Sequence, residues 1–323
     1  MASIRGLHVY TGEGYNTLTV DILDEVKSNT NMNKLVLHLA NSSQVRFEYG
    51  NSKNKPVDAT AQCISALKKF LPLWEDSDMT ANRMWIALPY LHNNGTTYNN
   101  AKDLYADYKD FMQKVKSAVL STLGETTWNN YVEGFYFSTE TVMPIQSKIS
   151  STTPTSNSMV KLMNDISAYI RSTLDKKFLW CPYYGFGQYA DNITYNLGVI
   201  ANRTNIFDHI FIQPAYYFQA GNNCTSDNLT AVYRSAKFNE VEDLRGNSIA
   251  GGRKSNATAT IGVNMEANDN AVRPSTPESR RFQEYIDQYQ DLVRGTPMVF
   301  YAGATDNLSR NTTLSQKIGK FYK

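Results

Sequence analysis

Short apolar runs alternate with longer amphipathic stretches along the whole sequence, and polar loops separate them. Runs rich in β-branched and aromatic residues are typical of buried strands, whereas apolar positions spaced by about 3.6 residues are typical of helices. Eight runs are predicted to be strands: 4–10, 34–39, 83–89, 134–138, 178–182, 209–214, 258–265 and 298–301. The stretches between them are predicted to be helices: 17–27, 59–73, 101–123, 158–174, 189–201, 226–238, 277–293 and 314–322.

Eight strand–helix units in one chain predict a (β/α)8 barrel, the TIM-barrel form of the α/β class. An open doubly wound sheet is the alternative, but no GxGxxG motif follows the first strand to support it. No linker or low-complexity tract divides the chain, so we expect a single domain over 1–323. The long loops at 41–56, 91–100, 139–155 and 216–225 follow strands, which is where such a barrel carries its active site.

Two glutamates end strands on opposite sides of the predicted barrel. Alternate side chains of a barrel strand point inward, and the apolar residues of each strand show which set faces the helices. In the strand that leads to Glu266, the apolar set is Ile261, Val263 and Met265; in the strand that leads to Glu140, it is Phe135 and Phe137. The inward set therefore contains Tyr136, Ser138, Glu140, Gly262, Asn264 and Glu266, with both glutamates at the rim.

Paired carboxyl groups across a barrel mouth are typical of glycosidases. One acts as a general acid, and the other attacks the sugar carbon or activates water. The plain alternative for either residue is an ordinary solvated or salt-bridged glutamate at a strand end. Asp269, three residues after Glu266, is a further candidate base for an inverting reaction.

The later strands carry a family resemblance. The segments GFYFSTE, KFLWCPYYG, IFIQPAYYF, IGVNME and VFYAGA resemble an uncharacterised bacterial family of unknown function with glycosidase-like TIM barrels. More loosely, the chain is similar to the clan of retaining glycosidases with the acid/base on strand four and the nucleophile on strand seven. This resemblance implies that Glu140 is the acid/base and Glu266 the nucleophile. Thr139 stands where that clan usually has asparagine.

Aromatic and amide side chains near the other strand ends suit a carbohydrate cleft, because sugar C–H faces stack on rings and hydroxyl groups bond to amides. We expect Phe178 and Phe211 to belong to the core. The residues expected to bind substrate, besides the catalytic pair, are Tyr10, Glu13, Tyr136, Trp180, Tyr183, Gln213, Tyr216 and Asn264.

Composition narrows the classes of partner. The net charge is +2 with no basic block, so no nucleic-acid partner is expected. No apolar run approaches the roughly 20 residues of a transmembrane helix, so no membrane insertion is expected. The four histidines show neither HxH nor HExxH spacing, and the three cysteines show no CxxC spacing. We therefore expect no metal and no cofactor, and the histidines His8 and His38 are expected to be satisfied core or rim residues.

These patterns predict a glycoside hydrolase, in retaining form, that acts on a polysaccharide or oligosaccharide. The alternative is a non-catalytic carbohydrate-binding or cell-surface module on the same barrel. Such a hydrolase is usually exported, so we expect a secreted or cell-surface protein; the start lacks a signal-peptide pattern, which leaves a cytoplasmic location as the alternative. The sugar, its linkage, endo or exo action and the oligomeric state stay open.

Overall fold

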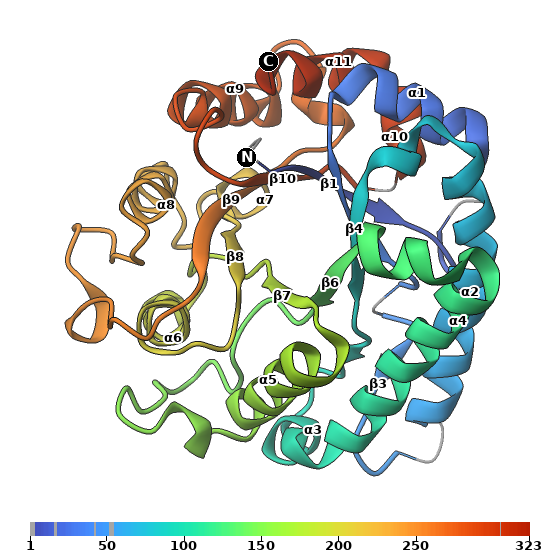
Figure 1. Ribbon diagram of the computed structural model, residues 1–323. Coiled ribbons are helices and arrows are strands. Elements are labelled where there is room, and N and C mark those ends of the chain that lie inside the picture. The colour runs from blue at the N-terminus through green and yellow to red at the C-terminus, as the bar shows by residue number, and fades with distance from the viewer. Residues whose placement is uncertain (1–3, 16–17, 42, 52–54, 304) are drawn as a thin grey trace.

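The computed structural model describes residues 4–15, 18–41, 43–51, 55–303 and 305–323. In this part of the chain, eight parallel strands close into a barrel in the order β1-β2-β4-β6-β7-β8-β9-β10, as predicted (Figure 1). The strands are β1 (Arg5–Tyr10), β2 (Lys34–His38), β4 (Arg83–Ala87), β6 (Val132–Phe137), β7 (Lys177–Trp180), β8 (His209–Ile212), β9 (Thr260–Glu266) and β10 (Met298–Tyr301).

Helices surround the barrel on its outer side (Figure 1). The main ones are α1 (Val20–Thr30), α2 (Pro56–Asp76), α4 (Tyr105–Tyr131), α5 (Ser158–Tyr169), α6 (Ala190–Arg203), α8 (Asp227–Phe238), α9 (Pro277–Tyr289) and α11 (Thr312–Phe321). Capping residues explain where some of these helices begin. Thr19 accepts a hydrogen bond from Ile22 at the start of α1, and Thr276 does so from Ser279 at the start of α9. Residue 17, where the first helix was expected to begin, lies outside the described residues.

Small elements in the loops after strands were not predicted. They are β3 (Arg46–Phe47), β5 (Tyr90–Leu91), α3 (Gly95–Asn99), α7 (Tyr216–Gln219) and α10 (Thr305–Arg310). The strands β3 and β5 pair in parallel with each other, outside the barrel sheet. Elements of two to six residues give no detectable period, so only the long loops could be foreseen from the sequence.

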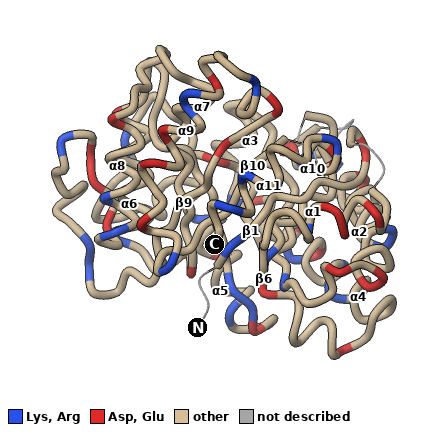
Figure 2. The backbone as a smooth tube through the Cα atoms, turned by 90° about the horizontal axis from the view of Figure 1, so that it is seen from above, with Lys and Arg blue, Asp and Glu red and all other residues tan. Residues whose placement is uncertain are grey.

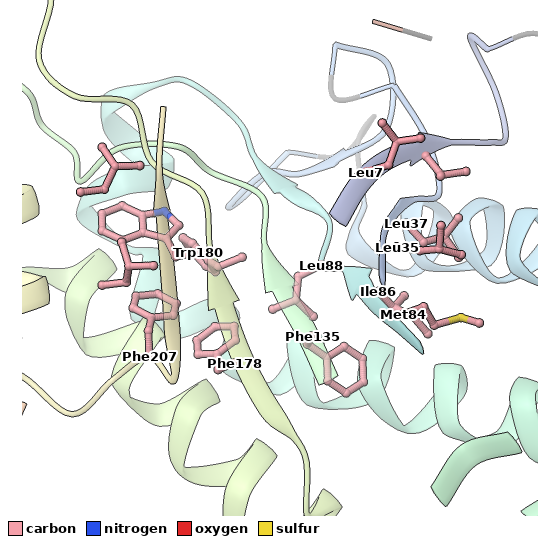
Figure 3. Packing of buried hydrophobic residues seen from close by; sticks show 14 of the residues in the cluster. Leu7, Leu35, Leu37, Met84, Ile86, Leu88, Phe135, Phe178, Trp180 and Phe207 are labelled. Atoms are coloured by element: carbon pink, nitrogen blue, oxygen red, sulfur yellow. The ribbon is translucent and has the colours of Figure 1, made fainter. Parts of the chain in front are cut away.

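The core has two layers, and the predicted alternation of strand residues is confirmed. Phe135 and Phe137 of β6 lie in the larger core between strands and helices, whereas Tyr136 lies in the cluster inside the barrel. Figure 3 shows part of the outer layer, with Phe135 and Phe178 beside the helices. The buried cluster inside the barrel comprises Val36, Trp85, Ala87, Tyr136, Leu179, Cys181, Phe211 and Val299.

Charged residues of both signs are spread along the chain (Figure 2). One ionic cluster joins four neighbouring strands at the amino-terminal end of the barrel. Glu133 of β6 forms salt bridges with Lys34 of β2 at 2.8 Å, Arg83 of β4 at 3.4 Å and Lys177 of β7 at 3.1 Å. None of the helices in the described part of the chain is both long and apolar enough to cross a membrane.

Candidate active site

A cavity of about 410 Å³ opens at the carboxyl ends of the barrel strands. Residues that end or follow the strands form its wall, as expected for the functional face of this fold. The lining residues are Tyr10, Tyr15, His38, Ala40, Tyr90, Tyr136, Ser138, Glu140, Tyr183, Phe186, Gln213, Ala215, Phe218, Gln219, Glu266 and Tyr301. Both glutamates at the strand ends therefore border the same cavity.

Glu140 follows β6 and is fixed through its backbone and its carboxyl group. Its carbonyl accepts a hydrogen bond from the Tyr183 amide at 3.1 Å. Its Oε1 accepts one from Nε2 of Gln213 at 2.8 Å. Burial raises the pKa of Glu140 to about 7, and the hydrogen bond from Gln213 offsets only part of this effect. Glu140 can therefore hold a proton near neutral pH, as a general acid must.

Glu266 is the last residue of β9 and is 4% exposed. The hydroxyl of Tyr285 on α9 donates a hydrogen bond to its Oε2 at 2.6 Å. Burial raises the pKa of Glu266 to about 7; hydrogen bonds from Tyr285 and from the Ala215 backbone oppose this shift, and the charge of Glu140 adds to it. The two carboxyl groups are thus electrostatically coupled, so ionisation of one disfavours ionisation of the other.

The turn after β8 contacts both carboxyl groups. The Gln213 side chain donates to Glu140, and the Ala215 backbone N–H donates to Glu266. Ala215 adopts a left-handed conformation with φ of 64°, which is uncommon for a residue with a side chain. Gln213 also donates to the carbonyl of Cys181 at 2.6 Å, which anchors its amide. This turn therefore fixes the position of one glutamate relative to the other.

Two histidines lie side by side at the cavity: His38 lines its wall, and His8 contacts His38. Nδ1 of His8 and Nε2 of His38 are 2.8 Å apart, and the ring of Tyr10 stacks on that of His38 with centroids 4.2 Å apart. Burial lowers the pKa of His8 to about 3, although a hydrogen bond with Asn264 opposes the shift, and burial also lowers that of His38. Both rings are therefore neutral at physiological pH.

Aromatic rings from several loops surround the space above the carboxyl groups. Tyr15 contacts Tyr10 at a centroid distance of 4.9 Å, and Phe218 of α7 contacts Tyr301 at 6.0 Å. Tyr301, the last residue of β10, lies within electrostatic range of both glutamates, because their charges add to the burial that raises its pKa. The cavity thus presents rings and hydroxyl groups together.

The structure brings six of the ten predicted site residues to the cavity wall: Glu140, Glu266, Tyr10, Tyr136, Tyr183 and Gln213. The side-chain NH₂ group of Gln213 donates hydrogen bonds to Glu140 and to the carbonyl of Cys181. It therefore positions Glu140 and has no further N–H to donate to a ligand. The rim orientation deduced for the two glutamates from strand alternation agrees with this placement.

Trp180 does not face the cavity, which corrects the expected orientation. It is 1% exposed and stacks on Phe207 in the outer core at a centroid distance of 5.3 Å, as Figure 3 shows. Its strand neighbours Leu179 and Cys181 occupy the barrel interior, so alternation sends Trp180 toward the helices. Its Nε1 donates to the carbonyl of Thr139 at 2.8 Å, which supports the residue before Glu140 from behind.

Three more predicted residues lie away from the cavity. Tyr216 borders a separate surface groove beside α8 and α9, because the turn into α7 directs Phe218 rather than Tyr216 to the cavity. Glu13 is exposed and lines a neighbouring pocket of about 440 Å³ with Lys69 of α2. Asn264 is 1% exposed inside the barrel, below the cavity and against His8.

Asp269, the candidate base for inversion, is also absent from the described cavity wall; it accepts a hydrogen bond from Asn311 at 3.3 Å. The described residues contain no group of three or more histidine, cysteine or acidic side chains that could hold a metal ion.

Sequence reasoning missed several lining residues, namely His38, Tyr90, Phe186, Phe218, Gln219 and Tyr301. Tyr301 shares the inward face of β10 with Val299, but both faces of that strand are apolar, so alternation gave no contrast to detect. The others depend on how loops of different length fold over the barrel mouth, which local pattern does not specify.

No family model matches the sequence, and no curated protein matches it. Solved structures do match in fold. A GH5-4 broad specificity endoglucanase from an uncultured bacterium shares 14% identity and a TM-score of 0.54, covering 96% of this chain and 85% of its own. The ChiA C-terminal domain of Legionella pneumophila shares 10% identity and a TM-score of 0.51, covering 97% of each chain.

A GH18 chitinase from Pseudoalteromonas aurantia has 12% identity and a TM-score of 0.48, covering 98% of this chain and 99% of its own. At such low identities, the likeness to the endoglucanase and the ChiA domain concerns the fold alone. The chain is a (β/α)8 barrel, the fold that it shares with these two structures.

Proposed function

We propose that this protein is a glycoside hydrolase that cleaves a polysaccharide or oligosaccharide with Glu140 and Glu266. The observation that carries the proposal is that two carboxyl groups, the half-buried Glu140 and the buried Glu266, each with a pKa raised to about 7, line one aromatic cavity at the functional end of the barrel. None of the described lining residues is lysine or arginine. Placing two acids in such a cavity is costly for folding, and catalytic sites are where such groups are typically retained.

The hydrogen bonds divide the roles. Glu266 receives two donors, from Tyr285 and Ala215, and donors to a carboxylate stabilise its charged form. Glu140 receives one side-chain donor, Gln213. Glu266 is therefore the anion that attacks the sugar carbon, and Glu140 is the acid that protonates the leaving oxygen and later deprotonates water.

Coupling between the two groups supports this division. After the first proton leaves the pair, the remaining one is held more tightly, so a singly protonated pair persists over a range of pH. The rate is expected to follow a bell-shaped curve centred near neutral pH, with both groups protonated below it and both ionised above it.

The test is hydrolysis of a panel of purified polysaccharides by the parent and by Glu140→Gln and Glu266→Gln variants, with chromatography of the products. Each variant should lose about a thousandfold or more in kcat. NMR of the first product anomer tests retention. Glu133→Gln makes the same chemical change at the opposite end of the barrel and should leave kcat unchanged.

Parent-like rates in both site variants would contradict the assignment. No cleavage by the parent on any polysaccharide, with retained binding to one of them, would instead support the non-catalytic carbohydrate-binding module.

A further inference from the structure

Among the described residues that line the cavity, none has a side chain that could neutralise an anionic ligand. None of its described lining residues is lysine or arginine. His38, the one lining histidine, stays neutral because burial and the neighbouring His8 lower its pKa well below 6.5. An anionic sugar would therefore place its charge near Glu140 and Glu266 without a counter-ion, and burial of an unpaired charge beside like charges is strongly unfavourable.

What the cavity does offer is rings and neutral polar groups. Six lining residues are tyrosines and two are phenylalanines. The amide of Gln219 and the neutral ring of His38 add further neutral polar groups. Rings stack on the C–H faces of a sugar, and phenol and amide groups exchange hydrogen bonds with its hydroxyls without any change in charge.

We propose that the site takes a glycosyl residue without an acidic group and discriminates against uronic acids and sulfated sugars. This inference rests on the proposed function for the identity of the ligand as a saccharide. It concerns binding, so it can be measured without any turnover.

The experiment compares matched 4-methylumbelliferyl glycosides that differ in one group: glucoside and glucuronide, and galactoside and galacturonide, in both anomeric forms. Binding to the parent is measured at pH 8, where both carboxyl groups are largely ionised. We expect at least one neutral glycoside to bind about tenfold or more tightly than its uronide.

Two variants separate charge from shape. In the double variant Glu140→Gln with Glu266→Gln, which cannot hydrolyse a ligand, the preference for the neutral glycoside over the uronide should shrink. Gln219→Arg supplies a cation at the cavity wall and should strengthen uronide binding, whereas Gln219→Met, similar in size, should not.

Uronide binding equal to that of the neutral glycoside would overturn the inference, as would failure of every neutral glycoside to bind. Selective binding of a neutral glycoside without hydrolysis would uphold this inference while the proposed reaction failed.

Discussion

Burial favours the neutral forms of Glu140 and Glu266. The hydrogen-bond donors around each carboxyl group oppose this effect and limit how far its pKa rises. Tyr285 is the closest such donor, at 2.6 Å from Glu266, and its oxygen also accepts the backbone N–H of Tyr217 at 3.1 Å. This phenol lies on a helix of the outer layer, so it acts on the site only by holding the glutamate.

Tyr285→Phe is expected to raise the pKa of Glu266, because it removes a donor to the charged form. The nucleophile would then ionise only at higher pH, so the acidic limb of the kcat/KM profile should move up by about one pH unit. Tyr289→Phe is the matched control on the same helix, since that hydroxyl donates to the carbonyl of Leu229 instead. If the acidic limb of the Tyr285→Phe variant stayed at the pH of the parent, ionisation of Glu266 would not be what determines that limb.

The buried charge of Glu266 should also affect stability. Its pKa is raised in the folded protein above its unfolded value of about 4.5, so the folded state loses stability as pH rises from about 4.5 to 7. Glu266→Gln removes this loss and should be more stable than the parent at pH 8 by about 3 kcal/mol, with little difference at pH 4. Urea unfolding at the two pH values measures it; a variant less stable than the parent at pH 8 would refute the raised pKa.

At the scale of elements, the turn between β8 and α7 ties the two glutamates together. It supplies a side-chain amide to one and a backbone N–H to the other, and the left-handed Ala215 aims that N–H. Strained residues of this kind persist where the surrounding structure holds them, often at functional sites.

Gln213→Met should raise the pKa of Glu140 by removing its donor while keeping the side chain similar in size. An acid with a higher pKa stays protonated to higher pH, so the basic limb of the kcat/KM profile should move to higher pH. Tyr285→Phe, in contrast, should move the acidic limb. Gln219→Met lines the same cavity without contacting either carboxyl group and is the control. Movement of the acidic limb alone would reverse the roles assigned to the two glutamates.

Across the whole molecule, the two ends of the barrel treat acidic side chains in opposite ways. Burial alone would raise the pKa of Glu133, but the hydrogen bonds and charges of Lys34 and Lys177 outweigh it and lower the pKa to about 2. At the other end, no lysine or arginine is among the described residues that line the cavity with Glu140 and Glu266, and burial raises the pKa values of both. The amino-terminal end therefore pairs its acidic side chain in a way that stabilises the fold, whereas the proposed function places chemistry at the carboxyl-terminal end.

Glu133→Gln should lower the free energy of unfolding at pH 7 by about 2 kcal/mol, because it leaves Lys34 half-buried without a charged partner. A lowered pKa gives stability that is present above about pH 4.5 and lost as pH falls toward 2, so the difference from the parent should narrow at pH 3. Urea unfolding at both pH values checks this. A difference that grows at pH 3 would contradict the ionic role.

The sequence by itself determined the barrel, its strands to within a few residues and the rim position of both glutamates. These features depend on local periodicity: period two separates the faces of β6 and β9, and period 3.6 marks the helices. A polar residue at the end of an apolar strand is visible in a single sequence, which is why Glu140 and Glu266 could be found.

Only the tertiary structure decided which other residues meet them. Trp180 and Tyr301 both end strands that are apolar on both faces, so nothing local distinguished the ring that packs outward from the one that borders the cavity. Tyr285 reaches Glu266 from a helix, and Gln213, 73 residues further along the chain than Glu140, reaches that residue from the turn after β8. Such contacts, and the pKa values they set, arise from closure of the barrel and from loop packing, which bring together residues with no pattern in common.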